Sequence, residues 1–110
     1  MKAEQLAECA GLSIFNKGED KQITKVYCCD LLSFVMGRAP EGCAWVTVMG
    51  NVNSAAVSVL ADIGAIILAD GVKPDENLLS KSADEGIMLL GSKEPIFETA
   101  LRIHEALENG

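Results

Sequence analysis

The chain has 110 residues, 49% of them apolar, and its nine Lys and Arg stand against sixteen Asp and Glu, for a net charge of −7. The apolar content excludes a disordered chain, and the negative charge disfavours nucleic acid as a partner because it repels phosphates. A chain of this length can bury roughly two thirds of its unfolded surface, which is enough for one core. We therefore expect a single domain over residues 1–110.

The four cysteines are predicted to be reduced thiols that pack as small apolar residues. The first residues contain no secretion signal, and the longest apolar runs are about a quarter of a membrane span, so we expect a cytoplasmic protein without a membrane partner. Cys28 and Cys29 are adjacent and Cys43 stands alone, with no C-x-x-C spacing and no nearby His. These spacings predict no metal site; a redox or metal role for the three thiols is the alternative hypothesis.

The first half of the chain predicts two helices and two strands of uneven length. The first helical pattern ends at Gly11, and a polar turn separates the two strands. The second strand alternates polar and apolar residues, which is typical of a strand with one solvated face, and Asp30 is expected to cap the helix after it. The predicted elements are a helix over 3–10, a strand over 12–15, a strand over 22–29 and a helix over 31–36.

The second half predicts a regular alternation of strand and helix. Its apolar runs are continuous, which indicates strands that are buried on both faces. The predicted strands are 44–49, 65–69 and 87–90. The predicted helices run from a cap at Asn53 or Ser54 to Gly64, from Pro74 to Gly86, and from Glu94–Pro95 towards the end of the chain.

Connections of only a few residues require each helix to cross over between parallel strands. The sequence therefore predicts an α/β fold, namely a three-layer α/β/α domain with a mostly parallel sheet. Within it, Met36 is expected in the core, and His104 is expected to lie half-buried beside the apolar face of the last helix. Trp45 and Tyr27 are either buried or partly exposed at a dimer surface, and a homodimer is our expectation.

Three loops follow predicted strands at the end of the sheet where α/β proteins bind ligands. Each loop combines a glycine with polar side chains and opens a helix, whose free N–H groups favour anions. Ordinary caps and turns are the competing interpretation, in particular for Asp70 before Gly71. The residues predicted to bind a small anion or a nucleotide are Asn51, Asn53, Ser54, Asp70, Gly71, Lys73 and Ser92.

No catalytic constellation is visible in the sequence. The motifs G-x-x-x-x-G-K-[ST], G-x-G-x-x-G, G-x-S-x-G and H-E-x-x-H are absent, and the chain has one histidine. We therefore expect no enzymatic activity, no catalytic residue and no cofactor. A phosphotransfer-related role that uses Asp70, Ser92 or Asn51 is the alternative.

Several segments suggest a family, and together they cover nearly the whole chain. The chain resembles DRTGG-domain proteins, and within them the short stand-alone versions found near iron-only hydrogenase genes, some of which are described as serine kinases. It is also similar to the amino-terminal domain of HPr kinase/phosphorylase, a protein whose kinase chemistry resides in a separate P-loop domain. The segments that carry the resemblance are residues 19–27, 30–33, 44–48, 66–72 and 85–90.

The sequence departs from the pattern that names the family, which is an Asp-Arg pair at a strand end and a later Gly-Gly. Asn51-Val52 stands at the first position and Asp70-Gly71 at the second, so the charged Asp-Arg pair is absent. The resemblance therefore implies anion binding there that is weakened, lost or changed in specificity. It does not imply kinase activity, because this chain has no P-loop.

The residues and the resemblance together predict a non-enzymatic regulatory or ligand-sensing module, linked to hydrogenase function by the resemblance. Its predicted ligand is a nucleotide or a small anion at the strand-end loops. A structural dimerisation or assembly domain without a ligand is the alternative to this function.

Overall fold

Five helices and five strands alternate along the chain in the computed structural model, which describes all 110 residues. The predicted order of elements is confirmed, although several boundaries differ. In chain order the elements are α1 (Ala3–Cys9), β1 (Ser13–Asn16), β2 (Val26–Cys28), α2 (Leu32–Arg38), β3 (Ala44–Thr47), α3 (Val52–Leu60), β4 (Ala65–Leu68), α4 (Glu76–Glu85), β5 (Leu89–Gly91) and α5 (Ile96–Asn109).

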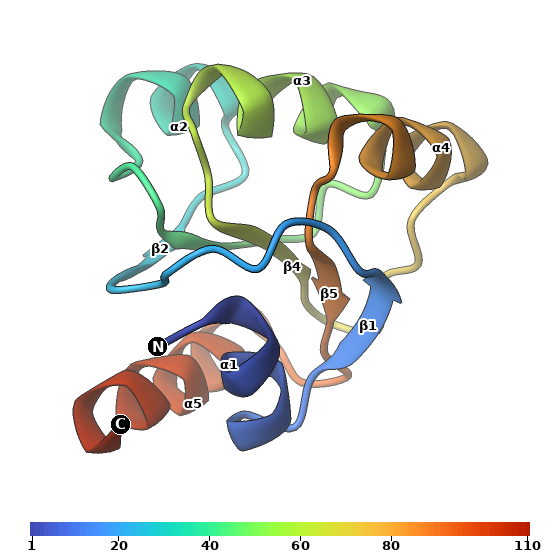
Figure 1. Cartoon of the computed structure of the whole chain (residues 1–110). Helices are drawn as coiled ribbons and strands as arrows, with labels where there is room; N and C mark the ends of the chain where they lie inside the picture. Colours follow the sequence, from blue (N-terminus) through green and yellow to red (C-terminus); the bar gives the residue numbers. More distant parts are fainter.

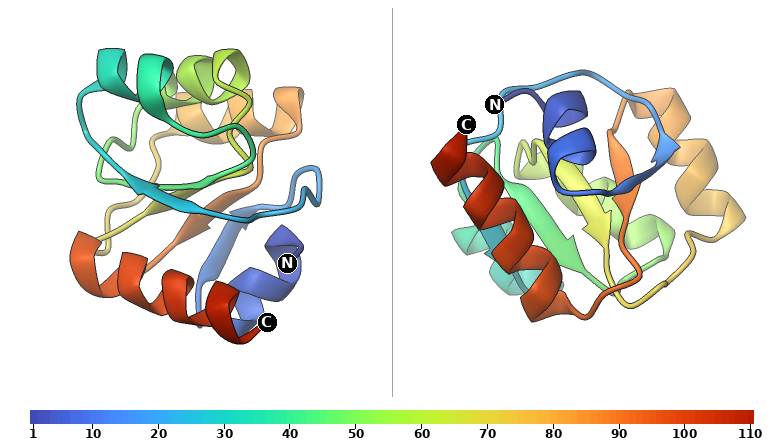
Figure 2. Two further views of the ribbon diagram at one scale, coloured as in Figure 1. Left: turned by 90° about the vertical axis from the view of Figure 1, so that its left-hand side faces the viewer. Right: turned by 90° about the horizontal axis from the view of Figure 1, so that it is seen from below.

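The strands form one sheet in the order β1-β5-β4-β3-β2. Strands β2 to β5 are parallel to one another, because a helix crosses over between each pair that follows in the chain. β1 pairs antiparallel with β5, so the sheet is mixed but mostly parallel, as predicted. Helices α2, α3 and α4 lie over one face and α1 and α5 over the other, while β1 and β2 form the two opposite edges (Figures 1 and 2).

The two faces of the sheet bury side chains of different size, because successive residues of a strand point to opposite faces. The face under α1 and α5 carries many small residues, and α1 adds Ala3 and Ala7, with Ala10 directly after its end, so small side chains line both sides of this contact. That side of the core contains Ala3, Ala7, Ala10, Ala44, Val46, Ala65, Ile67, Ala69 and Leu90. The face under α2, α3 and α4 is filled by larger groups, among them Trp45, Ile66, Leu68, Leu78 and Leu89.

The two ends of the chain meet on the α1–α5 side of the sheet. Met1 begins beside α1, and its side chain packs against Gly110 at the end of α5. All three ribbon views place the termini close together (Figures 1 and 2).

Helix α4 ends at Gly86 as predicted, but it begins at Glu76 and not at Pro74, because Asp75 takes the cap position. The Asp75 carboxylate accepts a hydrogen bond from the Leu78 N–H at 2.8 Å, and Gly86 closes the helix in the left-handed conformation at φ 68°. The predictions for α3 were wrong at both ends. Asn51 is its cap, and Asp62, at φ 52°, makes the left-handed turn that we had assigned to Gly64.

Three predictions about the first half and the last helix also fail. The strand predicted over 22–29 shrinks to β2, because Ile23 turns into the core before the pairing with β3 begins. Met36 is exposed rather than buried, since the short helix α2 buries only Val35. His104 lies on the solvent side of α5, where its imidazole Nε2 is 3.8 Å from the Glu108 carboxylate.

Truncation of Ile67 should measure how far stability depends on the doubly covered strand β4. Ile67 is completely buried between the sheet and α1 and α5, so Ile67→Ala leaves a cavity and should lower the free energy of unfolding by about 2–5 kcal/mol. Leu60→Ala removes the same class of side chain at a position that is 70% exposed, and should change it by less than about 0.5 kcal/mol. Urea denaturation measures both; equal losses would contradict this account of the core.

Candidate functional site

The carboxyl ends of β3, β4 and β5 lie at one edge of the sheet, because these strands are parallel. The three predicted binding loops therefore leave the sheet on the same side. The antiparallel strand β1 adds its first residue, Ser13, which pairs with Gly91 of β5. Asp30 joins the same edge because it follows directly after β2.

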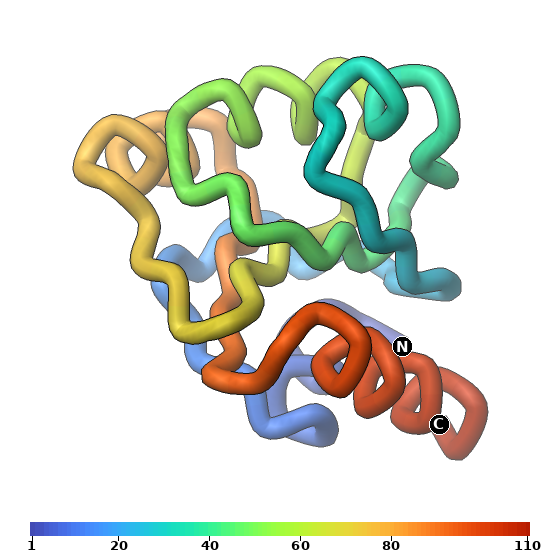
Figure 3. Tube along the Cα trace, turned by 180° about the vertical axis from the view of Figure 1, so that it is seen from behind, coloured from blue at the N-terminus to red at the C-terminus, as the bar shows by residue number.

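The loops after β4 and β5 are joined by backbone hydrogen bonds. The Asp70 N–H donates to the Glu94 carbonyl at 2.8 Å, and the Gly71 N–H donates to the Ser92 carbonyl at 2.9 Å. Asp70 and Gly71 both take left-handed conformations, at φ 58° and 70°, to aim these two amides at the next loop. Seen from behind, the two segments lie side by side (Figure 3). Their N–H groups are thereby used within the protein and do not form a free anion cradle.

The loop after β3 uses its predicted binding groups for local structure. The Asn51 side chain caps α3 by accepting from the Asn53 N–H at 3.0 Å. The buried Ser54 hydroxyl donates to the Met49 carbonyl at 2.6 Å. The side-chain contacts of this loop are therefore those of an ordinary helix cap. Its three predicted binding residues do not line the hollow formed by the other loops.

Two adjoining polar hollows open at the ends of β1 and β5. We call the pair the β1–β5 hollow. Its larger part, about 390 Å³, is lined by Gly11, Ser13, Gly91, Ser92, Lys93, Glu94 and Arg102. A smaller part of about 50 Å³ shares Ser13, Gly91, Ser92 and Lys93 and adds Phe15, Gly71, Val72 and Lys73. Three of the seven predicted residues thus line this pair of hollows: Ser92 lines both, while Gly71 and Lys73 line only the smaller one.

Three cationic side chains surround the β1–β5 hollow. The Lys73 ammonium lies 5.8 Å from the centre of the Phe15 ring, a cation–π distance that holds it over the smaller part. Arg102 reaches the larger part from α5 and pairs with the Glu94 carboxylate. Lys93 lies between them in the lining of both parts and forms no ion pair. Sequence reasoning missed Ser13 and Arg102, because each comes from an element outside the strand-end loops.

The Ser92 hydroxyl has a defined place in this hollow. Its oxygen accepts from the Glu94 N–H at 3.1 Å and lies 2.8 Å from the hydroxyl of the buried Thr99. Thr99 can also donate to the Glu94 carbonyl, at 3.1 Å. When Ser92 accepts both bonds, its own O–H proton is left to donate to a group in the hollow.

Asp30 does not cap α2 as the sequence predicted; Leu31 takes the cap position without any side-chain bond. Instead, one carboxylate oxygen of Asp30 accepts from the Thr47 hydroxyl at 2.7 Å and from the Val48 N–H at 3.1 Å. These bonds tie the end of β2 to the end of β3. Only the parallel pairing of the two strands brings the groups together, so the sequence carried no direct signal of them.

The buried Cys43 and the exposed Cys28 both keep their protons to higher pH than a free thiol does. Burial raises the pKa of Cys43 to about 11, and partial desolvation followed by the neighbouring Asp30 charge raises the pKa of Cys28 above its ordinary value. Because the thiolate is the reactive form, both shifts disfavour the redox alternative. No group of three or more His, Cys, Asp or Glu side chains is arranged to hold a metal ion.

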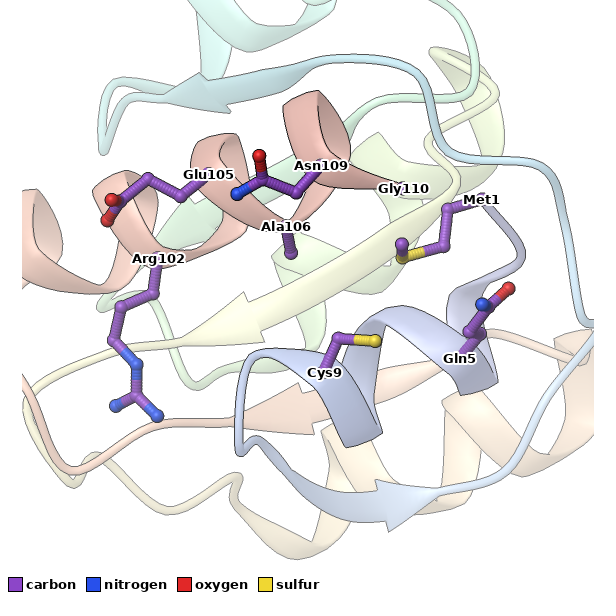
Figure 4. Close-up of a pocket in the computed structure, with 8 residues that line it drawn as sticks. All are labelled: Met1, Gln5, Cys9, Arg102, Glu105, Ala106, Asn109 and Gly110. Atoms are coloured by element: carbon purple, nitrogen blue, oxygen red, sulfur yellow. The ribbon is translucent and has the colours of Figure 1, made fainter.

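A second hollow, of about 490 Å³, lies away from the strand-end loops, between α1 and α5. Figure 4 shows Met1, Cys9 and Ala106 around its middle, with Arg102 extending past the end of α1. It gathers no cluster of like charges, so we assign the candidate site to the β1–β5 hollow. None of the helices combines the length and the apolar character that crossing a membrane requires.

No family model and no curated protein matches the chain. Among solved structures, it is similar to the CBS and DRTGG domains of the regulatory region of Clostridium perfringens pyrophosphatase, crystallised with the activator diadenosine tetraphosphate. The TM-score is 0.71 at 12% identity, over 92% of this chain and 45% of that chain. The fold is DRTGG-like. The chain spans less than half the length of that structure, and the likeness is one of fold.

Removal of the Asp30 carboxylate should weaken the joint between β2 and β3. Asp30→Ala leaves the buried Thr47 hydroxyl without its acceptor and should lower the free energy of unfolding by about 1–3 kcal/mol. Asp30→Asn keeps one acceptor oxygen and should lose less. Asp84→Ala, at an exposed position of α4, is the control in urea denaturation. A loss no larger than that of the control would contradict the proposed joint.

Stability should fall at alkaline pH through Cys43. In the unfolded chain this thiol ionises near its ordinary pKa of 9.0, whereas in the folded chain it keeps its proton up to about 11. Between these values the folded state binds more protons, so the free energy of unfolding decreases as the pH rises. Denaturation as a function of pH should show a shallower decline for Cys43→Ala, which keeps the contribution of Cys28. An unchanged decline would refute the assignment.

Proposed function

We propose that this chain is a non-enzymatic regulatory domain that binds a nucleotide or another small phosphate-bearing anion in the β1–β5 hollow. The observation that carries the proposal is the placement of three of the chain's nine Lys and Arg at these two adjoining hollows: Arg102 lines the larger, Lys73 the smaller and Lys93 both. In a protein of net charge −7, such a local group of cationic side chains favours the binding of an anion there.

The chemistry of the lining fits a phosphate group. Lys93 is an unpaired cation, the Ser92 O–H can donate, and Lys73 lines the smaller hollow beside the Phe15 ring. Arg102 is shared with Glu94, so its guanidinium contributes less than a free cation would. About 390 Å³ is within the size range of small-molecule sites, and it accommodates a phosphate chain better than a flat surface would.

The fold supports a regulatory role. The similar structure belongs to the regulatory region of a pyrophosphatase and was crystallised with a dinucleotide polyphosphate. We carry the ligand class, a phosphate-bearing nucleotide, to this chain as part of the proposal. The hydrogenase-associated setting and the likeness to the amino-terminal domain of HPr kinase/phosphorylase rest on the sequence resemblance alone.

The role of the remaining predicted residues changes in this proposal. Asp70 carries a negative charge beside the hollow and holds the loop through its backbone, so it positions the loop and does not bind the anion. Asn51, Asn53 and Ser54 support α3. The ligand contacts are assigned to Lys73, Ser92 and Lys93, with the Gly71 backbone forming the wall.

Ligand binding should raise the melting temperature, and more so for a tighter ligand at the same concentration, because the anion binds the folded state only. We expect ATP or diadenosine tetraphosphate to raise it at millimolar concentration more than inorganic phosphate does. Lys93→Ala and Lys73→Ala should each weaken binding about tenfold, the effect of losing roughly 1.4 kcal/mol at a charged hydrogen bond. Lys81→Ala, whose ammonium pairs with Glu85 on α4, should bind normally.

The absence of any shift with the whole set of anions would overturn the proposal. So would equal weakening by Lys81→Ala and Lys93→Ala, because binding would then follow net charge and not the hollow. Mass analysis after incubation with ATP checks the phosphotransfer alternative, for which Ser92 is the candidate acceptor; we expect an unchanged mass.

A further inference from the structure

Strand β2 has one free edge. It pairs with β3 on one side, and the sheet order places no strand on the other. The Ala44 N–H donates to the Lys25 carbonyl, and the Cys29 N–H donates to the Val46 carbonyl, so the odd-numbered residues face β3. In a parallel pair the alternate residues turn the other way. The backbone N–H and C=O groups of Val26 and Cys28 therefore point outward, where another strand can reach them.

The two edges of the sheet differ in how they are protected. The pairing of β1 with β5 is interrupted by a register shift between Ile14 and Asn16, and such a bulge discourages further pairing. β2 pairs with β3 residue by residue over its whole length, without a bulge. The regular edge is the one available for strand addition.

Large apolar side chains flank this open edge on both faces of the sheet. β2 lies between α2 and α5 in the side view (Figure 2). Leu31 and Phe34, at α2, are 57% and 46% exposed, and Phe97 and Leu101 of α5 are 70% and 42% exposed. Phe97 and Leu101 are four residues apart and share one flank of α5, opposite the flank on which Arg102 and Ala106 face α1.

We propose that the β2 edge binds the β2 edge of a second copy of this chain, so that one antiparallel sheet runs through a two-fold dimer. With the axis at Tyr27, Val26 lies opposite the partner's Cys28, and the outward groups of these two residues form four backbone hydrogen bonds around the axis. The same axis places α2 beside the partner's α2 and α5 beside the partner's α5. The exposed apolar residues are then covered from both sides.

Charge also favours a second copy in this orientation. Lys25 precedes β2 and Asp30 follows it, and both side chains are exposed. Antiparallel pairing brings the basic start of each strand to the acidic end of its partner, whereas a parallel arrangement would place like charges together. Because β2 has a basic residue at its start and an acidic residue at its end, two antiparallel copies of it are complementary in charge. This self-complementarity is what the isologous contact of a two-fold dimer requires.

The mass of the chain in solution tests this inference. Sedimentation velocity should give twice the 11.7 kDa of the chain. Val26→Pro removes an outward N–H without touching the pairs with β3, and Phe97→Glu places a charge in the apolar flank; each should weaken the dimer at least tenfold. Ile14→Glu changes a side chain that is 48% exposed on the opposite edge, and it should remain dimeric. Circular dichroism verifies that all variants fold.

A wild-type chain that sediments as a monomer at millimolar concentration would overturn the inference. A dimer that withstands both Val26→Pro and Phe97→Glu but dissociates in Ile14→Glu would overturn it as well, by placing the contact at the other edge. The dimer surface and the β1–β5 hollow use different residues, so a chain that dimerises without binding nucleotide refutes only the proposed function, and a nucleotide-binding monomer refutes only this inference.

Discussion

The burial of β3 and β4 on both faces is the constraint on which the rest of the structure depends. Every residue of these two strands is inaccessible to solvent, so each face needs a helical cover. The alanines of one face allow α1 and α5 to approach closely, and Trp45 and the larger aliphatic residues of the other face support α2, α3 and α4. Helices α2, α3 and α4 connect parallel strands, so strands β2 to β5 run in the same direction. All the loops that follow these strands therefore leave the sheet at the carboxyl ends of the strands.

This constraint also explains which parts of the fold could be predicted from the sequence. The continuous apolar runs over 65–69 and 87–90 and the glycine at position 86 are local signals: β4 and the end of α4 lie where these signals placed them, whereas β5 begins two residues after the start of its run. The pairing partners of β1 and β2 are not local properties. β1 pairs with the free side of β5, and β2 pairs with the free side of β3. Neither the position of β1 in the sheet nor its direction could therefore be derived from its own residues.

The candidate site shows the same division. The position of the loops followed from the topology, but the use of each polar group depended on distances that the sequence does not encode. Asn51 and Ser54 satisfy backbone groups of their own loop, while Ser92 and Lys73 line a hollow. Asp30, read as a helix cap, instead bonds to Thr47 across two strands. Arg102 comes from the middle of α5, eight residues after Glu94, the loop residue with which it pairs.

The meeting of Met1 and Gly110 has a consequence for the connectivity of the fold. A linker of a few glycines would close the backbone into a ring without moving α1 or α5, since the ends already share one surface. New ends could then be opened in the loop between β1 and β2, which joins the antiparallel edge strand to the parallel part of the sheet. The order in which the elements occur along the chain is therefore separable from their arrangement in space, and such a circular permutant should retain the sheet and both helical covers.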